Sequence, residues 1–345
     1  MIEVDGSKKG GSGTILRLSV ALSAITGQPL HIYNVRHNRP QPGLKPQHLE
    51  AVLTAAKLCN AELDGARIDS RELWFKPREV EGGKIEAEIG TAGSIPMLLM
   101  TVLPICAYAK RTVVLHVSKG GTDVSNAPTT NYMRFVLLPT LCRMGLEATL
   151  KVNKYGYYPR GNGEVTATVK PAESLRPLHM ETFGKIKAIK GVSVCTFLAE
   201  RKVAERQAKA AKDYLKEKGY ATEIQAVNDT SNPLQKGSSI VLWAETDAGT
   251  LLGADAIGEL KKTSEKVGEE AAQKLYAEIS AKPTVDVHLA DLLIPYVALA
   301  KGSSIYFTRA VSEHLETNIW VTEQILNARF NVEKVNGLHK VEKTE

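Results

Sequence analysis

The sequence predicts an α/β fold in which three related units form one large domain and a smaller α+β domain is inserted before the third unit. Two observations lead to this prediction. Residues 13–36 and 93–118 repeat one order of features, a Gly-Thr-Ile or Gly-Ser-Ile start, an apolar stretch and a strand, at an offset of 80 residues (13 to 93). The same order returns only at residues 287–335. We therefore expect the large domain over residues 1–180 and 281–340 and the inserted domain over 181–280.

Each of the first two units is expected to run helix, strand, helix, strand and one further hairpin strand, RELWFKP or GEVTATVKP. In the first unit the strand LHIYNVR and the loop NRPQPGLKP precede a helix that ends near Cys59. In the second unit the strand TVVLHVS and the loop GGTDVSNAPTT precede a helix that ends near Cys142. Helical spacing of apolar residues after each loop and alternating polarity in the strands support these assignments. We expect sheets that bury one face under helices.

The third unit is predicted from the helix VHLADLLIPYVALA, the strand SIYFTR, the helix SEHLETNIWVTEQILNA and the strand RFNVEKV. The insert has a different pattern. Its strand KIKAIKGVSVCTF is followed by a helix over 200–218, the strands ATEIQAV and SSIVLWAE, and a helix over 262–280. This β-α-β-β-α order is sufficient for a small α+β domain.

Composition limits the class of protein. The 345 residues are 43% hydrophobic and 24% charged, which are ordinary globular values. No apolar run reaches the ~18 residues that span a bilayer, and the start MIEVDGSKKGG lacks the apolar stretch of a signal peptide, so we expect a cytoplasmic protein. The four cysteines are scattered and suggest buried thiols rather than a zinc site. A net charge of +6 suits a polyanionic ligand without requiring one.

Three loops contain residues suited to phosphate chemistry. Residues 5–14, DGSKKGGSGT, form a glycine-rich turn before the first helix, where free backbone N–H groups bind phosphate well. Residues 36–48, RHNRPQPGLKPQH, place arginine and lysine side chains in a turn stiffened by prolines. Residues 120–132, GGTDVSNAPTTNY, include Asp123, which could hold a metal or a hydroxyl. Each loop also fits an ordinary structural role, as a flexible turn, a solvated basic loop or a capped turn.

Six motifs in order along the chain resemble those of the RNA 3′-terminal phosphate cyclases, particularly archaeal ones. They are RPQPGLKPQHL, GTAGSI, GGTDVSNAP, YYPRGNGEV, VAERQA and SEHLETNIW. The resemblance runs from residue 1 to about 335. It implies three units similar to the C-terminal domain of a bacterial translation initiation factor, with a small inserted domain. It also implies an ATP-dependent enzyme that converts an RNA 3′-phosphate to a 2′,3′-cyclic phosphate.

The resemblance implies roles for individual residues. His314 corresponds to the histidine that attacks the α-phosphate of ATP and carries AMP, and imidazole is a competent nucleophile at neutral pH. AMP would then pass to the RNA 3′-phosphate, and the adjacent 2′-hydroxyl would close the ring. The expected cofactors are ATP and Mg²⁺ or Mn²⁺, and the expected partner is RNA with a 3′-phosphate end, with a homodimer as one option. The residues expected around ATP and its phosphates are Arg17, Arg36, Arg39, Gln47, Pro128, His288 and Asp291.

The site departs from the family pattern at several positions. The family glutamate that holds the divalent ion is Gly10 here, so the metal ligand is unassigned. Three positions that are usually glutamine in the family are Thr14, Met100 and Leu292 in this chain, and one position that is usually aspartate is Asn131. Two interpretations therefore stay open. The first is an active cyclase, favoured by His314 and the arginines; the second is a weak or inactive cyclase-like RNA-processing or RNA-binding protein, favoured by the replacements.

Overall fold

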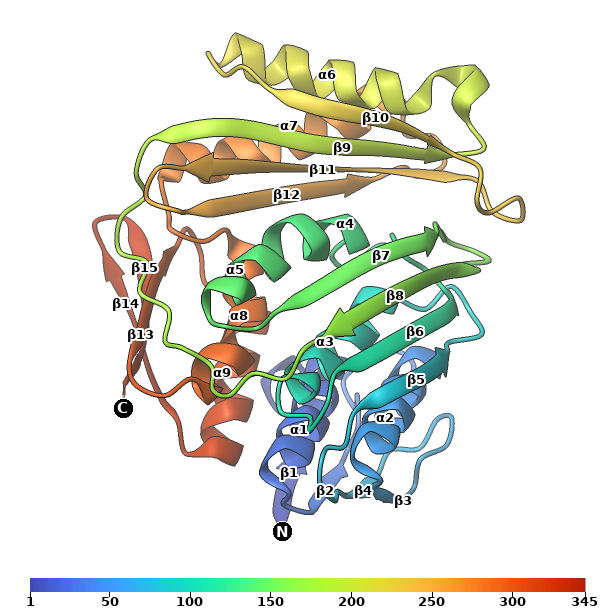
Figure 1. Ribbon diagram of the computed structural model, residues 1–345, viewed down its shortest axis with the longest axis vertical. Helices are drawn as coiled ribbons and strands as arrows, with labels where there is room; N and C mark the ends of the chain where they lie inside the picture. Colours follow the sequence, from blue (N-terminus) through green and yellow to red (C-terminus); the bar gives the residue numbers. More distant parts are fainter. Residues whose placement is uncertain (345) are drawn as a thin grey trace.

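The computed structural model describes residues 1–344 and shows a group of central helices enclosed by small sheets (Figure 1). Three of these sheets belong to the three repeated units, and the fourth, with its two helices, forms a separate layer at one end of the molecule. This arrangement confirms the predicted α/β class. Across residues 1–344, no helix combines the length and the apolar character needed to cross a bilayer.

The first unit has the sheet order β1-β2-β4-β3, in which β1 is parallel to β2 and the other pairs are antiparallel. Ser12 caps its first helix by accepting a hydrogen bond from the Thr14 N–H, and Gly27 ends that helix in the left-handed region. The elements are β1 (Ile2–Asp5), α1 (Gly13–Thr26), β2 (Leu30–Tyr33), α2 (Pro46–Cys59), β3 (Glu62–Asp64) and β4 (Leu73–Lys76).

The second unit repeats this topology strand for strand. Its sheet order is β5-β6-β8-β7, again with a parallel first pair and antiparallel pairs after it. Its second helix is interrupted by a π-helical segment, Met133–Leu137, between α4 (Thr130–Tyr132) and α5 (Leu138–Arg143). The other elements are β5 (Gly83–Glu88), α3 (Ile95–Cys106), β6 (Val113–Gly120), β7 (Ala148–Lys154) and β8 (Gly163–Val169).

The third unit has the order β13-β15-β14 and lacks a full first strand. In its place a single parallel bridge joins His179 to Ile305 of β13. The additional chain segment therefore enters directly after the position that the first strand occupies in the other two units. The hairpin strand β15 was not among the predicted elements. The elements are α8 (Val287–Leu299), β13 (Ser304–Thr308), α9 (Glu313–Leu326), β14 (Arg329–Val335) and β15 (Leu338–Thr344).

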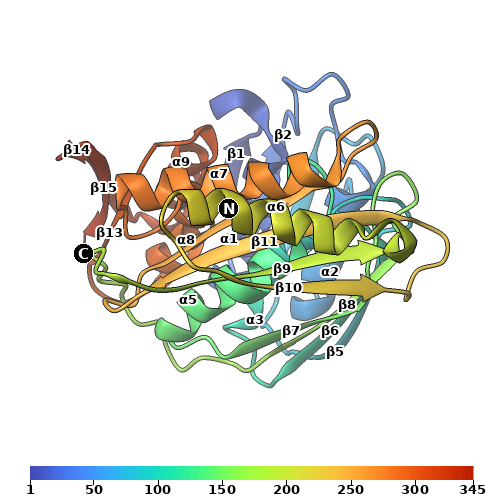
Figure 2. The ribbon, with the colours of Figure 1, turned by 90° about the horizontal axis from the view of Figure 1, so that it is seen from above.

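The inserted segment forms the sheet β10-β9-β11-β12, with two helices side by side on one face (Figure 2). The predicted β-α-β-β-α order was wrong by one strand, because β12 lies between β11 and the last helix. Glycine is unusual inside a strand, but Gly253 is required in β12 because a Cβ atom there would collide with Val136 and Tyr132 of the second unit. The elements are β9 (Ile186–Thr196), α6 (Val203–Glu217), β10 (Glu223–Asp229), β11 (Gly237–Thr246), β12 (Leu251–Ile257) and α7 (Ser264–Ala281).

The other face of this sheet packs on the second unit. The rings of Trp243 in β11 and Phe135 stack with their centroids 4.7 Å apart. Val241 and Trp243 belong to the same hydrophobic core as the helices of the repeated units. Because β11 is covered on both faces, nearly all of its residues are buried, which explains its continuous apolar sequence.

Candidate active site

A cavity of about 360 Å³ lies where the helices of all three units begin. The starts of α1, α3, α8 and α9 reach it, so the dipoles of these helices give the cavity a positive field. The helix residues on its wall are Thr14, Arg17, Met97, Met100, Tyr132, His288, Asp291, Leu292, His314 and Asn318. The loop 126–128 and two residues of the inserted segment, Asp255 and Lys274, complete the wall.

His314 is the second residue of α9 and its side chain reaches the cavity. Its Nδ1 lies 3.4 Å from Thr14 Oγ1. Partial desolvation of the ring, and then the positive charge of Arg17, lower the pKa of His314 below its ordinary value. The imidazole is therefore neutral at neutral pH, and a proton on Nδ1 shared with Thr14 leaves the Nε2 lone pair free for attack.

Arg17 is a buried cation on the cavity wall. Only 7% of its surface is exposed, and within residues 1–344 it has no carboxylate partner. Its Nη2 donates a hydrogen bond of 3.2 Å to Thr14 Oγ1. Burial, and then the charge of Arg36, lower the pKa of Arg17 to about 10. A buried charge without a counter-ion is unfavourable, so this guanidinium is suited to meet an anionic ligand.

The glycine-rich turn before α1 allows close packing around Arg17. His48 is buried, and a Cβ atom at Gly13 would collide with His48 Nε2 and lie 3.0 Å from Arg17 Nη1. Burial, and then the charges of Arg17, Arg36 and Lys45, lower the pKa of His48 to about 2, so the ring is neutral. Gly13 therefore lets a neutral ring pack beside the arginine.

Asp291 fixes the start of α9. Its Oδ1 accepts a 2.6 Å hydrogen bond from Ser312 Oγ, and Ser312 caps α9 by accepting from the Leu315 N–H at 2.9 Å. The Asn318 side chain donates to the Asp291 carbonyl at 2.8 Å. Burial raises the pKa of Asp291 to about 7, partly offset by the Ser312 bond. These contacts hold the helix turn that carries His314.

Another part of the wall offers a flat surface for a ring. Tyr132 and His288 meet edge to face, with centroids 6.4 Å apart and planes at 90°. Asp286 Oδ1 accepts from Tyr132 Oη at 2.7 Å and from the His288 N–H at 3.0 Å, which fixes both residues. Pro128 also contacts the cavity. An aromatic base would find the exposed ring of His288 and a proline face here.

Five of the eight predicted site residues line this cavity: Arg17, Pro128, His288, Asp291 and His314. The other three do not. Arg36 Nη1 donates to the carbonyls of Gln41 and Gly43, both at 2.8 Å, and Gln47 Oε1 accepts from the Ser94 N–H at 2.8 Å. Arg39 is exposed outside the wall. Arg36 and Gln47 thus build the loop 36–48 and tie it to α3, and the predicted contacts of all three with phosphate stay predictions.

The inserted segment also contributes to the cavity wall, which was not predicted from the sequence. Lys274 of α7 lines the cavity, and its Nζ lies 3.0 Å from the Asp255 carbonyl and 2.9 Å from Glu270 Oε1. Asp255 Oδ2 accepts from the Thr129 N–H at 2.7 Å and so fixes the loop before α4. Without β12 in the predicted order, nothing in the sequence placed Asp255 next to the repeated units.

One carboxylate stands where the family glutamate is missing. Gly10 has φ 69°, and a Cβ atom added there would collide with Glu313 Oε1. The Glu313 side chain therefore occupies the space that a side chain at position 10 would enter. Among the described residues no group of three or more His, Cys, Asp or Glu side chains is arranged to hold a metal ion. Glu313 is therefore the carboxylate that could supply a metal ligand beside this turn.

Comparisons with known proteins agree over almost the whole chain. A family described as RNA 3′-terminal phosphate cyclase matches residues 8–332. The chain is 45% identical to the RNA 3′-terminal phosphate cyclase of Pyrococcus furiosus over 96% of this chain and 95% of the relative. It is 45% identical to that of Caldivirga maquilingensis, over 100% and 97%, and 43% identical to that of Pyrobaculum neutrophilum, over 99% and 97%.

Proposed function

The chain belongs to the RNA 3′-terminal phosphate cyclase family, and from this premise we propose that it uses ATP to convert an RNA 3′-phosphate to a 2′,3′-cyclic phosphate through an AMP adduct on His314. The observation that carries the proposal is one cavity that holds an accessible neutral imidazole and a buried arginine without a counter-ion. A nucleophile beside an unsatisfied cation suits attack on a polyphosphate.

In the first step, His314 Nε2 attacks the α-phosphorus of ATP. A P–N bond forms, the bond to the bridging oxygen breaks, and pyrophosphate leaves with that electron pair. Arg17 lies two hydrogen bonds from His314, through Thr14, and stabilises the negative charge on the phosphoryl oxygens. Thr14 thus keeps a direct contact with the nucleophile although it replaces the usual glutamine.

In the second step, an oxygen of the RNA 3′-phosphate attacks the phosphorus held on His314. The P–N bond breaks and AMP passes to the RNA end. In the third step, the adjacent 2′-hydroxyl loses its proton and attacks the RNA phosphorus, AMP leaves, and the 2′,3′-cyclic phosphate closes. A terminal 2′-deoxyribose has no such hydroxyl, so it stops the sequence after the second step.

The remaining residues of the wall position the reactants. Asp291 and Ser312 hold the first turn of α9 and with it the imidazole. His288 and Pro128 provide faces for the adenine ring. Glu313 is the residue that would bind Mg²⁺ or Mn²⁺, together with phosphate oxygens, and a bound divalent ion would neutralise phosphate charge.

The cyclase reaction is tested with RNA labelled in its terminal 3′-phosphate. Incubation with ATP and a divalent metal should make the label resistant to phosphatase. RNA that ends in 2′-deoxyribose should instead accumulate an adenylated end. His314→Ala should give neither product, while His288→Ala, a matched histidine change on the same wall, should still react at saturating ATP. Phosphatase-sensitive label after incubation with wild-type protein would favour the alternative, an RNA-binding or RNA-processing protein without catalysis.

A further inference from the structure

A second cavity, of about 840 Å³, lies next to the His314 cavity. The two share a loop, because residues 126–128 line the first cavity and residues 123–125 line the second. They also share β12, whose Asp255 faces the first cavity and whose Ile257 faces the second. Two residues of a strand span about 7 Å, so a chain that leaves one cavity can enter the other within a short distance.

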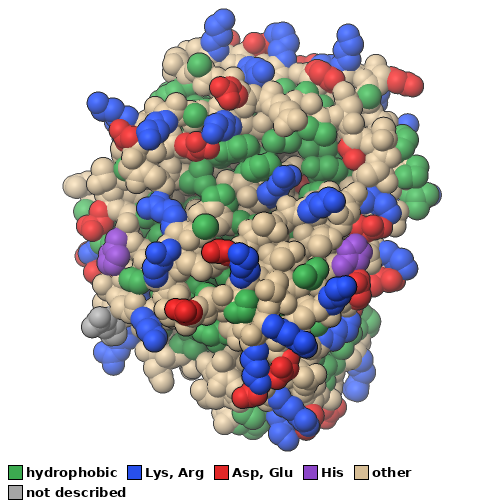
Figure 3. Space-filling view, viewed as in Figure 1, with side chains coloured by type: hydrophobic (Ala, Val, Ile, Leu, Met, Phe, Trp, Pro, Cys, Tyr) green, Lys and Arg blue, Asp and Glu red, His purple; other side chains and the backbone are tan. Residues whose placement is uncertain are grey.

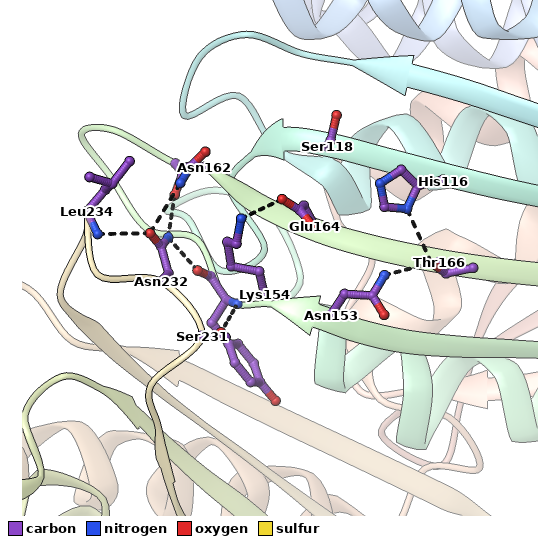
Figure 4. Close-up of polar contacts among 12 residues, drawn as sticks. His116, Ser118, Asn153, Lys154, Asn162, Glu164, Thr166, Ser231, Asn232 and Leu234 are labelled. Carbon is purple, nitrogen blue, oxygen red and sulfur yellow. Dashed lines mark hydrogen bonds and ion pairs between the residues drawn. The ribbon is translucent and has the colours of Figure 1, made fainter.

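Hydrogen bonds between the repeated units and the inserted segment fix the mouth of this second cavity (Figure 4). Asn232 is fully buried, and its Nδ2 donates to the carbonyls of Tyr155 at 2.7 Å and Gly161 at 3.0 Å. Ser231 Oγ accepts from the Tyr155 N–H at 3.2 Å, and Gln235 Oε1 accepts from the Arg160 N–H at 3.2 Å. The walls are thus held in place before any ligand binds, which lowers the ordering cost of binding.

The lining of the second cavity carries more basic than acidic side chains, with Asp123 and Glu259 as its acids. Arg201, Lys236 and Lys261 are exposed on its wall, and no carboxylate within the described chain forms an ion pair with any of them. Lys262, in contrast, is paired with Glu270. On the face shown in Figure 3, basic and acidic side chains are intermingled, whereas Arg201, Lys236 and Lys261 line one cavity. This wall is suited to successive negative charges.

An exposed aromatic ring accompanies the cations. Tyr158 lines the cavity with 77% of its surface exposed. Its neighbour Tyr157 is buried against Gly237, where a Cβ atom would collide with the Tyr157 ring, so the backbone that carries Tyr158 is anchored. Cations that follow a phosphate backbone, together with a ring on which a base stacks, are the features of single-strand nucleic-acid sites.

We propose that the second cavity binds the single-stranded RNA segment that leads to the 3′-phosphate end, with Arg201, Lys236 and Lys261 on its phosphates and Tyr158 against a base. This inference rests on the proposed function, because it places the terminal phosphate in the His314 cavity. It makes the inserted segment, together with Tyr158 of the second unit, the part of the chain that holds the RNA body, whereas the third unit supplies the nucleophile.

The test is RNA binding without ATP, measured by fluorescence anisotropy. The probes are a 3′-phosphorylated dinucleotide, which reaches only the His314 cavity, and a 3′-phosphorylated RNA of ~10 nucleotides, which spans both cavities. The cavity variant combines Arg201→Glu, Lys236→Glu and Lys261→Glu. The matched control combines Lys84→Glu, Lys212→Glu and Lys216→Glu, which reverses the same charge at exposed positions away from both cavities.

The cavity variant should bind the longer RNA about a hundredfold more weakly than the control variant, with dinucleotide binding unchanged. The slope of log affinity against log salt concentration should become shallower by about 2 in the cavity variant, because three phosphate contacts with a single strand are lost. Tyr158→Ala should weaken the longer RNA about tenfold. Equal affinity of the cavity and control variants, or a longer RNA that binds no tighter than the dinucleotide, overturns the proposal. Labelling of His314 by ATP is measured separately, so its failure would count against the proposed function alone.

Discussion

Replacement of Arg17 by methionine should stabilise the fold while it removes activity. Burial, and then the charge of Arg36, lower the pKa of Arg17 from its ordinary value to about 10, which corresponds to ~3 kcal/mol of unfavourable free energy for the charged form. Because the folded pKa is the lower one, this penalty is fully present at neutral pH and disappears only as pH rises from about 10 to the ordinary pKa of arginine. Met keeps most of the volume of the side chain and leaves no buried charge. The free energy of unfolding should rise by up to ~3 kcal/mol, and Tm by up to about 4 °C.

The loss of activity in Arg17→Met follows from the same charge. Removal of one preorganised donor to developing negative charge slows catalysis by about 10²–10³. Label transfer from ATP to protein should fall by that factor, and ATP should no longer raise Tm. The control is Arg309→Met, because Arg309 Nη2 lies 2.9 Å from Glu278 Oε1, a carboxylate with only 6% of its side chain exposed. That variant should lose about 2 kcal/mol of stability. Destabilisation of Arg17→Met as large as that of Arg309→Met would refute the reasoning.

Three further predictions concern the neighbours of His314. Burial raises the pKa of Asp291 from 3.8 to about 7, so the free energy of unfolding of the wild type should fall as pH rises across that range. Asp291→Asn has no carboxylate to ionise, so its free energy of unfolding should not fall in the same way. Denaturant titrations between about pH 4 and pH 8 should show a free energy of unfolding up to ~4 kcal/mol higher for the variant than for the wild type. The lowered pKa of His314 keeps the ring neutral at neutral pH, so the rate of its labelling should be flat above pH 7 and fall only as pH drops below 6.5. Glu313→Gln should weaken Mn²⁺ binding in the presence of ATP about tenfold by electron paramagnetic resonance, whereas Glu316→Gln, an exposed acid on the same helix, should not.

Periodicity predicted the repeated units well, because each depends on local patterns. The helices α1, α3, α8 and α9 begin where Gly-Thr-Ile, Gly-Ser-Ile, Val-His-Leu and Ser-Glu-His occur in the sequence. The strand β12 was missed because Gly253 and Asp255 are poor strand residues, and both are explained only by tertiary contacts. Tertiary packing therefore decided β12, one of the two elements of the insert that reach the His314 cavity.

The candidate site was predictable in composition but not in its internal contacts. The resemblance named Arg17, His288 and His314, and the structure brings them to one wall. Nothing in the sequence indicates that the Arg36 side chain donates hydrogen bonds to carbonyls of its own loop. Nor does it indicate that Glu313 fills the space beside Gly10, because the two residues meet only through the packing of α9 against the N-terminal turn. The contact of Glu313 with Gly10 joins segments about three hundred residues apart, beyond the reach of any local pattern.

The most direct test of the central claim is covalent labelling of His314. Protein incubated with ATP labelled in its α-phosphate and a divalent metal should acquire label that is lost in acid and retained in alkali, as expected for a phosphorus–nitrogen bond. Mass spectrometry of the labelled peptide should place AMP on His314, and His314→Ala should remain unlabelled under the same conditions. Wild-type protein that takes up no label with any of several divalent metals, or a His314→Ala variant that labels as well as wild type, would contradict the account.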